Sequence, residues 1–309
     1  MAGRKEMEMK ATYVSLSSSQ TFAVREEDVS PGPGQVLIRI VACGICRGDV
    51  RAFMSGKPMA RIGHEPVGQV IETGPGVERV KVGDWVVGTL RGSFATHVVA
   101  DESEVYRIAP KLGPLGCLAE PIKCVTTVVR AATPSFGDAV AVVGCGFMGL
   151  CAIAALSARG LASLIAIDPL ESRRRLALAL GATQAADPSK AGTAAGVDVA
   201  IEFAGGPDAP NLAASLLRTC GRLVLAGGGS LSAPIYSRAL TVLHVPPAFS
   251  PDQSDDYRRA IAAMERGVFP LDKLVTHRFR FDEMQAAFTQ VAGGPQGYLK
   301  GIVTTEGLS

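Results

Sequence analysis

The chain has 309 residues, of which 47% are hydrophobic and 19% are charged, and its 31 basic and 29 acidic residues give a net charge of +2. This balance is typical of a soluble globular protein long enough for two domains, and it excludes an intrinsically disordered chain. No basic run stands out, so we expect neither a nucleic-acid partner nor an anionic membrane partner.

The start of the chain, MAGRKEMEMKATYV, carries charges but no apolar segment, so it does not have the pattern of a secretory signal. The longest apolar runs are interrupted by glycines and are expected to fall short of a membrane span. Seven cysteines are an odd number, and reduced thiols fit this chain better than a disulfide framework. We therefore expect a cytoplasmic protein.

The first third of the chain contains short runs of β-branched residues that Gly, Pro and Asp interrupt. Such runs predict strands, and the segments between them predict turns. The pattern favours a compact, largely antiparallel, barrel-like domain. The expected strands are 36–42, 67–74, 84–90 and 94–100.

The middle third alternates buried strands with apolar or amphipathic helices. Strand and helix in turn predict βαβ units on a parallel sheet. The expected strands are 139–146, 163–169, 197–206 and 221–229, and the expected helices are 148–160, 171–182 and 210–219.

The end of the chain returns to the character of the first third. A helix is expected over 255–267, and the tail then runs through the β-branched segments LVTHRFRF and YLKGIVTT. We therefore predict an α/β protein in which residues 1–121 and 263–309 form one β-rich domain. A doubly wound, parallel Rossmann domain is inserted at 122–262.

The segment GCGFMG (144–149) has the GxGxxG pattern of a dinucleotide-binding loop, and it lies between an expected strand and an expected helix. Gly144 permits the tight turn, Gly146 lets the backbone approach a pyrophosphate, and the helix N-terminus supplies N–H donors. The alternative is a glycine turn in an α/β protein that binds no nucleotide. The residues expected to contact the cofactor are Gly144, Gly146, Phe147, Met148 and Gly149.

Asp168 stands at the end of the next expected strand. Its carboxylate can accept two hydrogen bonds from a ribose and would repel a 2′-phosphate. Arg173 and Arg174 follow closely and could instead tolerate such a phosphate. We favour NAD as the cofactor, with NADP as the alternative.

Two cysteines three residues apart, in CGICRGDV (43–50), suggest either a metal site or a redox pair. A thioredoxin-like redox pair would need a βαβ context that this segment lacks. His64 and Glu65 follow in the sequence, and sulfur, nitrogen and oxygen donors on loops are the set that Zn²⁺ takes. The alternatives are a buried thiol at Cys46 and a hydrogen-bonded loop histidine at His64.

Three segments of the β-rich part, CGICRGD, GHEPVGQVIETGPGVERVKVGDWV and LAEPIKC, occur in one chain with the GxGxxG loop. Together they resemble the medium-chain dehydrogenase/reductase family, and within it the zinc-dependent alcohol and polyol dehydrogenases of the sorbitol dehydrogenase type. The resemblance covers nearly the whole chain. It implies a GroES-like, β-rich catalytic domain together with the Rossmann domain.

By this resemblance Cys46 and His64 are zinc ligands, and Cys43 is a strand residue that faces the core. The third protein ligand is Glu65 or Glu120, and the resemblance leaves both open. Zinc held in this way would polarise an alcohol oxygen while hydride passes to the nicotinamide.

Further roles are implied by the resemblance alone. Asp49 resembles the aspartate that orients the ligand histidine, and with Glu65 it is assigned to the catalytic machinery. Arg173 resembles a cation beside the adenosine ribose, and Lys300 resembles a basic residue near the pyrophosphate. The turns that would line the nicotinamide ribose contain Ala204, Ala226 and Gly227.

The chain departs from the family in two places. Only GTLR (88–91) stands where members with a structural zinc carry a four-cysteine loop, so we expect one zinc ion, the catalytic one. Gly48 replaces the usual Ser or Thr that starts the proton relay, and Arg51 replaces the relay histidine. The substrate proton must then leave through water, Glu65 or a group of the substrate.

The sequence thus predicts a zinc-dependent, NAD-linked dehydrogenase of secondary alcohols, such as a polyol, sugar or cyclitol, with the ketone as product. Two alternatives are a metal-free NADPH-dependent reductase of enones or quinones with the same fold, and a non-catalytic nucleotide-binding member. The family usually forms dimers or tetramers through its Rossmann sheets. The apolar segment 239–245 fits such an edge, so we expect a homodimer or homotetramer.

Overall fold

The computed structural model describes residues 9–246 and 248–306. It divides into a β-rich unit, Met1–Glu120 with Pro270–Ser309, and a Rossmann unit, Pro121–Phe269. The second boundary lies later than the 262/263 expected from the sequence. The reason is that helix α6 (Gln253–Glu265) continues through that point and belongs whole to the Rossmann unit.

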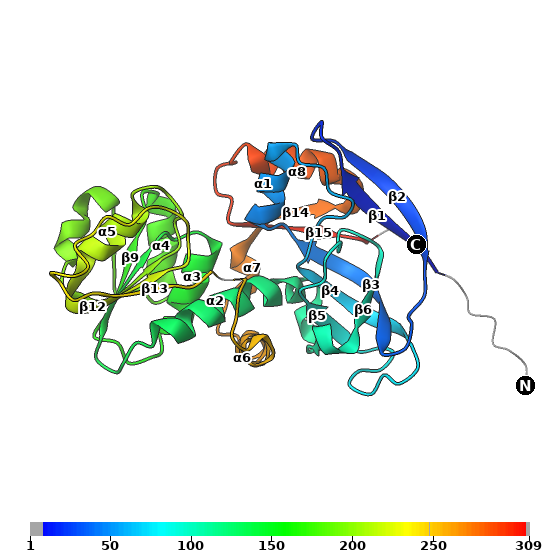
Figure 1. Ribbon diagram of the computed structural model, residues 1–309, viewed down its shortest axis with the longest axis horizontal. Coiled ribbons are helices and arrows are strands. Elements are labelled where there is room, and N and C mark those ends of the chain that lie inside the picture. Colours follow the sequence, from blue (N-terminus) through cyan, green and yellow to red (C-terminus); the bar gives the residue numbers. More distant parts are fainter. Residues whose placement is uncertain (1–8, 247, 307–309) are drawn as a thin grey trace, which may run out of the picture. The chain divides into compact units, whose positions relative to one another are not determined.

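A seven-stranded sheet forms the frame of the β-rich unit (Figure 1). All its strand pairs are antiparallel except β14 with β15. The four expected strands correspond to β3, β4, β5 and β6, and the tail supplies β14 and β15. In sheet order the strands are β14 (Val275–Arg280), β15 (Lys300–Thr304), β3 (Gln35–Gly44), β4 (Pro66–Thr73), β5 (Trp85–Gly88) and β7 (Val105–Arg107), with β6 (His97–Asp101) paired to β3.

The described part of the chain begins with a hairpin that was not expected from the sequence. Strands β1 (Met9–Leu16) and β2 (Phe22–Val29) form a separate two-stranded antiparallel sheet. Half of β2, FAVREEDV, is charged and none of its residues is buried, so it lacks the apolar run that marks the other strands.

Two hydrophobic clusters hold the β-rich unit together. One is the barrel interior, built from strands such as β3 and β6. The other packs α1 (Arg47–Ser55) and α8 (Met284–Ala292) against the sheet through four aromatic rings at Phe22, Phe53, Phe94 and Phe288. Phe288 is fully buried, so its replacement by Ala should cost about 3–5 kcal/mol of stability.

The short helical segments of this unit are η1 (Glu102–Glu104), η2 (Pro110–Leu118), α7 (Leu271–Leu274) and η4 (Phe281–Glu283).

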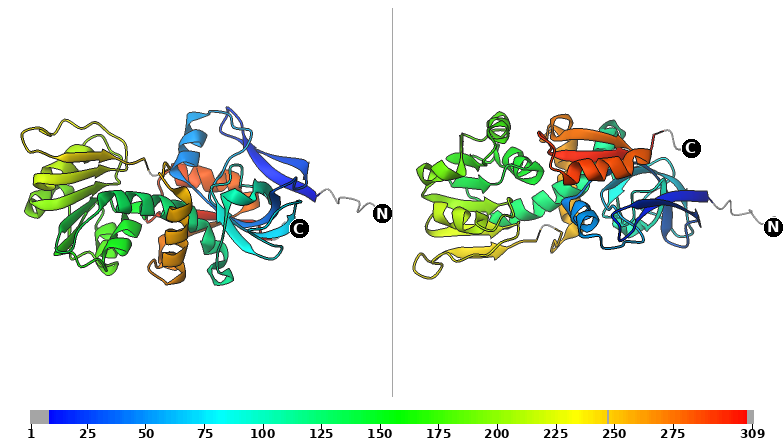
Figure 2. Two further views of the ribbon diagram at one scale, coloured as in Figure 1. Left: turned by 60° about the horizontal axis from the view of Figure 1, so that its bottom comes forward. Right: turned by 90° about the horizontal axis from the view of Figure 1, so that it is seen from above.

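A six-stranded, entirely parallel sheet forms the Rossmann unit (Figure 2). Its order is β10 (Gln184–Ala186), β9 (Ser163–Ile167), β8 (Ala139–Val143), β11 (Val197–Glu202), β12 (Leu217–Leu225) and β13 (Thr241–His244). This is the doubly wound order of dinucleotide-binding domains, in which the order of the strands reverses between β8 and β11. The expected helix 210–219 is too long, because α5 (Ala209–Leu216) ends where β12 begins.

Helices cover both faces of this sheet. Ala141 and Val143 of β8 pack with α5, whereas α3 (Phe147–Leu156) packs on the opposite face, where Gly149 lies beside Val142. The remaining helices are α2 (Ala119–Ala132), α4 (Glu171–Ala179), η3 (Pro188–Ala194) and α6.

One helical stretch, Pro110–Ala132, is long and apolar enough to cross a membrane by composition, which the sequence analysis did not expect. However, 72% of its apolar window is buried, and the chain is kinked at Gly113. These features are typical of a core helix in a globular protein.

A buried carboxylate ties α6 to α2 within the Rossmann unit. Asp256 is 1% exposed and accepts hydrogen bonds from Thr127 and from Ser250, both at 2.6 Å. It also forms an ion pair with Arg130. These contacts explain why α6 belongs to this unit rather than to the tail that follows.

Candidate metal and cofactor sites

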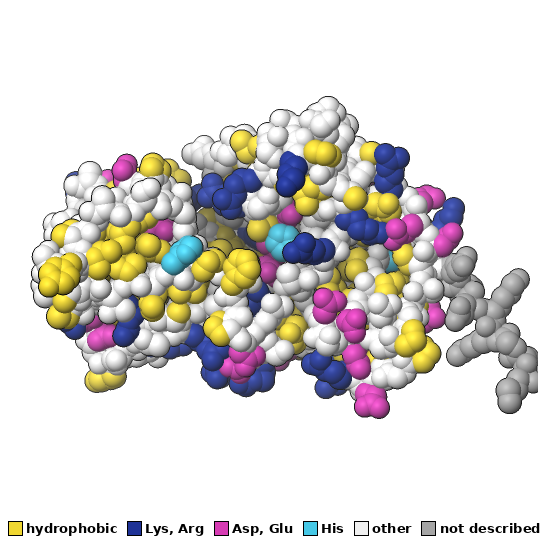
Figure 3. Space-filling model, viewed as in Figure 1, with side chains coloured by type: hydrophobic (Ala, Val, Ile, Leu, Met, Phe, Trp, Pro, Cys, Tyr) yellow, Lys and Arg dark blue, Asp and Glu magenta, His cyan; other side chains and the backbone are white. Residues whose placement is uncertain are grey.

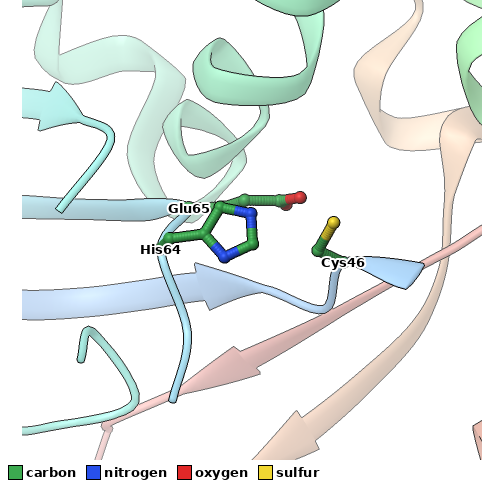
Figure 4. Close-up of side chains that lie close together, drawn as sticks. All are labelled: Cys46, His64 and Glu65. Atoms are coloured by element: carbon green, nitrogen blue, oxygen red, sulfur yellow. The ribbon is translucent and has the colours of Figure 1, made fainter. Parts of the chain in front are cut away.

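Three side chains of the β-rich unit converge on one point (Figure 4). One ligand atom each from Cys46, His64 and Glu65 lies within 4.8 Å of the others. In the described part of the chain this is the one group of three or more His, Cys, Asp or Glu side chains with such spacing. Sulfur, nitrogen and oxygen donors in this number are a set suited to a catalytic zinc site with an open position.

The position of Cys46 is fixed by the start of helix α1. Cys46 is the N-cap residue, and its Sγ accepts a hydrogen bond from the Gly48 N–H at 3.4 Å. In return, Asp49 Oδ2 accepts a hydrogen bond from the Cys46 N–H at 3.3 Å, which completes a capping box. The thiol is therefore held at the end of β3 before any metal binds.

Glycines bring His64 and Glu65 to the same place. Gly63 has φ +91°, and a Cβ there would lie 2.7 Å from the ring of Phe94. A Cβ on Gly44 would lie 2.0 Å from Glu65 Oε2. Both positions therefore require glycine for the loop before β4 to approach β3 this closely.

Asp49 also contacts the histidine. Its Oδ1 lies 3.5 Å from His64 Nδ1, and Asp49 itself is 5% exposed. Burial alone would lower the pKa of His64, but hydrogen bonds to Asp49 and Cys46 outweigh it and raise the pKa from 6.5 to about 11. An ion bound by His64 would have to displace that proton. The geometry agrees with the orienting role predicted for Asp49.

Lys300 lies in the metal site, which corrects the expectation that it lies near a pyrophosphate. Its Nζ is 2.5 Å from Glu65 Oε2 and donates to the Ile45 carbonyl at 3.0 Å. Both side chains of the pair are almost fully buried. Burial alone would lower the pKa of Lys300, but the Glu65 carboxylate outweighs it and holds that pKa above its usual value. Lys300 is thus the cation that balances the charge of Glu65.

The donor set retains capacity for a metal ion. Within the described ranges Glu65 Oε2 accepts no hydrogen bond of ordinary geometry, and its contact with Lys300 is an ion pair. Glu120, the other candidate ligand, is buried but lies outside the three-residue cluster, and its charge raises the pKa of Glu65. The geometry therefore favours Glu65 as the third donor. Cys43 is buried in the core, as expected.

Gly48 and Arg51, the two replaced relay residues, lie on the surface of helix α1. Gly48 is exposed on the first turn of α1, and a Cβ there would meet only the Cys46 sulfur, at 3.6 Å. Arg51 is exposed one turn later, with its Nε donating to the Arg47 carbonyl at 3.4 Å. A side chain at position 48 would fit, so the missing hydroxyl reflects the sequence and not a lack of space.

In the Rossmann unit the GxGxxG segment joins β8 to α3. Gly144 has φ +94°, and a Cβ on it would lie 2.6 Å from the Ala204 backbone nitrogen. Gly146 is the N-cap of α3 and offers no capping side chain, and a Cβ on it would meet nothing within 4 Å. Phe147 and Met148 open the helix, with Phe147 buried. Gly146 therefore places no side chain at the N-terminus of α3, where a phosphate could approach the first N–H groups.

Asp168 lies where the sequence predicts, directly after β9. Its Oδ2 accepts from the Cys145 N–H at 2.8 Å and its Oδ1 from the Leu170 N–H at 2.9 Å. Each carboxylate oxygen keeps a second lone pair for a ribose hydroxyl. Arg173 lies beside it, 3.8 Å from Oδ2, whereas Arg174 is hydrogen-bonded to the Asp168 carbonyl at 2.7 Å and paired with Asp187.

Glu202, at the end of β11, is a buried residue of this region that no sequence motif indicates. This side chain is 0% exposed, and its carboxylate accepts from the N–H groups of Gly205 and Gly227 at 2.6 and 3.2 Å. These glycines flank the predicted cofactor residues Ala204 and Ala226. The only signal in the sequence is an acidic residue in an otherwise apolar strand, three residues before the pair Gly205-Gly206.

Both units match known sequence families. Residues 32–120 match the alcohol dehydrogenase GroES-like domain, and residues 148–266 match the zinc-binding dehydrogenase domain. The first match contains the cluster of Cys46, His64 and Glu65, and the second contains most of the Rossmann unit.

Curated relatives and solved structures agree with these matches. The chain is 30% identical to (R,R)-butanediol dehydrogenase of Bacillus subtilis (strain 168), over 84% of this chain and 89% of the relative. It is 29% identical to L-threonine 3-dehydrogenase of Pyrococcus abyssi, over 88% and 92%. A zinc-binding dehydrogenase structure from Sinorhizobium meliloti 1021, bound to NADP, superposes with a TM-score of 0.85 at 26% identity, over 96% and 100%.

Proposed function

The chain belongs to the medium-chain dehydrogenase/reductase family, and from this we propose that it is a zinc-dependent dehydrogenase that transfers hydride between a secondary alcohol and NAD. Oxidoreduction of alcohols is common to its relatives, and we place the substrate among polyols, sugars and cyclitols. The observation that carries the proposal is the convergence of Cys46, His64 and Glu65 in the β-rich unit.

The residues of the β-rich unit would hold one zinc ion. A zinc ion bound there supplies a Lewis acid that lowers the pKa of a substrate hydroxyl. Asp49 holds His64 through Nδ1, which leaves Nε2 for the ion. Lys300 balances the charge of Glu65. Gly48 has no hydroxyl to receive the substrate proton, so the proton passes to water, to Glu65 or to the substrate itself.

NAD is the proposed cofactor because of the contacts of Asp168. Its buried carboxylate would face the adenosine ribose and repel a 2′-phosphate, as NADP carries. Arg174 donates hydrogen bonds to backbone carbonyls and forms an ion pair with Asp187. Arg173 is therefore the cation beside Asp168 that could contact the cofactor. These contacts support NAD over NADP.

We also propose that the protein is a homodimer or homotetramer and that it is cytoplasmic. β13 is the edge strand of the Rossmann sheet, and hydrophobic side chains gather over the part of this unit that carries α5, β12 and β13 (Figure 3). An unpaired edge of this kind can pair with a second copy in a homodimer or homotetramer. All seven cysteines are free thiols, which suits the reducing cytoplasm.

Metal analysis combined with a substrate screen tests the function. We expect purified protein to contain one zinc per chain and to reduce NAD with at least one member of a panel of polyols, sugars and amino-cyclitols. Protein without metal that oxidises NADPH with enones or quinones would overturn the proposal in favour of a metal-free reductase. Protein that binds NAD and turns over no alcohol in the panel would indicate a non-catalytic member.

A further inference from the structure

Glu202 carries a buried charge at the centre of the Rossmann sheet. β11 lies between β8 and β12, and Glu202 is level with Val143 on one side and Leu225 on the other. These three residues end three neighbouring strands of the sheet. The Glu202 side chain, fully buried, therefore lies where the loops after these strands begin.

Backbone N–H groups from two loops converge on Glu202. Its carboxylate accepts from Gly205 at 2.6 Å, from Gly227 at 3.2 Å and from Ala204. Its own carbonyl accepts from Ala226 and Gly227 at 3.0 and 3.1 Å. One residue thus fixes the loop after β11 and the loop after β12 relative to each other.

The packing around this carboxylate leaves little freedom. A Cβ on Gly227 would lie 2.6 Å from Glu202 Oε2 and 2.7 Å from the Gly205 nitrogen. Ala204, bound by the carboxylate, is the residue that a Cβ on Gly144 would strike. A shift of the Glu202 carboxylate is therefore passed to the GxGxxG loop as well as to the loop after β12.

Within the described ranges no Lys or Arg balances this charge, and its partners are backbone N–H groups. Burial outweighs these hydrogen bonds and raises the pKa of Glu202 above its usual value. A buried carboxylate without a cation is costly for stability, and such exceptions occur chiefly where function requires them.

The strand order tells which part of a dinucleotide these loops would meet. In a doubly wound sheet the dinucleotide lies across the carboxyl ends of the strands, at the point where strand order reverses. Asp168, after β9, lies on the adenosine side of that point, so the loops after β11 and β12 lie on the nicotinamide side. We propose that Glu202 is a positioning residue that sets these two loops to bind the nicotinamide half of the cofactor. This inference rests on the NAD dependence proposed above.

Binding of whole and truncated cofactors tests the role of Glu202. In Glu202→Gln an amide N–H₂ would face backbone N–H donors. We expect the dissociation constant for NADH to rise about tenfold, the loss of roughly one good hydrogen bond, and that for AMP to stay within about twofold. The KM for NAD should rise while the KM for the alcohol is unchanged. Asp168→Asn is the matched control, because it should weaken AMP and NADH together.

A second variant, Gly227→Ala, tests the same role if Glu202→Gln does not fold. Gly227→Ala leaves the carboxylate in place but pushes on it from the neighbouring loop, and we expect the same selective loss of NADH affinity. Equal losses for AMP and NADH, or no loss of NADH affinity in either variant, would overturn the positioning role while leaving alcohol oxidation by the wild type intact. A wild type that binds neither ligand would refute the NAD dependence and the positioning role together.

Discussion

Replacing Lys300 by Met should destabilise the metal-free protein strongly. The substitution keeps most of the side-chain volume but removes the ammonium 2.5 Å from Glu65 Oε2. Both side chains of this pair are at most 6% exposed, so water cannot replace the lost partner. Breaking a buried ion pair by removing one partner costs about 3–5 kcal/mol, because a buried charge is left unbalanced. For a unit of this size the melting temperature should fall by about 6–20 °C.

Thermal and urea unfolding of chelator-treated protein would measure this loss. Lys10→Met is the matched control, because Lys10 pairs with Glu26 on the surface, where both side chains are largely exposed and the pair contributes little. Added zinc should recover part of the stability of Lys300→Met, since a cation bound at Glu65 restores the charge balance. A loss no greater than that of the Lys10 variant would refute the assignment of Lys300 as the counter-charge of Glu65.

Three further predictions address the same sites. Asp49→Asn should lower zinc affinity about 10–100-fold, measured by chelator competition, since His64 loses its orienting carboxylate; unchanged affinity would contradict that role. Gly48→Ser supplies a hydroxyl at the start of the proton path and should raise kcat with a secondary alcohol at neutral pH about tenfold, with a profile less dependent on pH as the check. Burial raises the pKa of Cys145 to about 12, so its thiol should stay unmodified by iodoacetamide at pH 8 while exposed Cys220 reacts, as peptide mapping would show.

The predictable part of the fold follows from local patterns. The GxGxxG segment and the apolar runs around it predicted β8 and α3 and placed the start of each within one residue, because a buried strand, a tight glycine turn and an apolar helix each leave a mark in the local sequence. The expected ends, at 146 and 160, were three and four residues too late. The β1–β2 hairpin leaves no such mark, since half of β2 is charged and none of its residues is buried.

The site was predictable only where motifs name its residues. Cys46 and His64 stand in recognisable segments, and the structure brings them together with Glu65. Lys300 reaches this cluster from a strand whose contact with Ile45 spans 255 positions, and no local pattern encodes such a pairing. Glu202 was missed because its partners are backbone N–H groups, which every residue type can supply.

The zinc content of purified protein, compared between the wild type and Cys46→Ser, tests whether Cys46 holds a catalytic zinc ion. Serine keeps the N-cap of α1 but replaces the thiolate with a poor zinc ligand. We expect one zinc per chain in the wild type and none in the variant, with NAD-linked alcohol oxidation lost in parallel. A wild type without zinc, or a Cys46→Ser variant that keeps both metal and activity, would contradict this expectation.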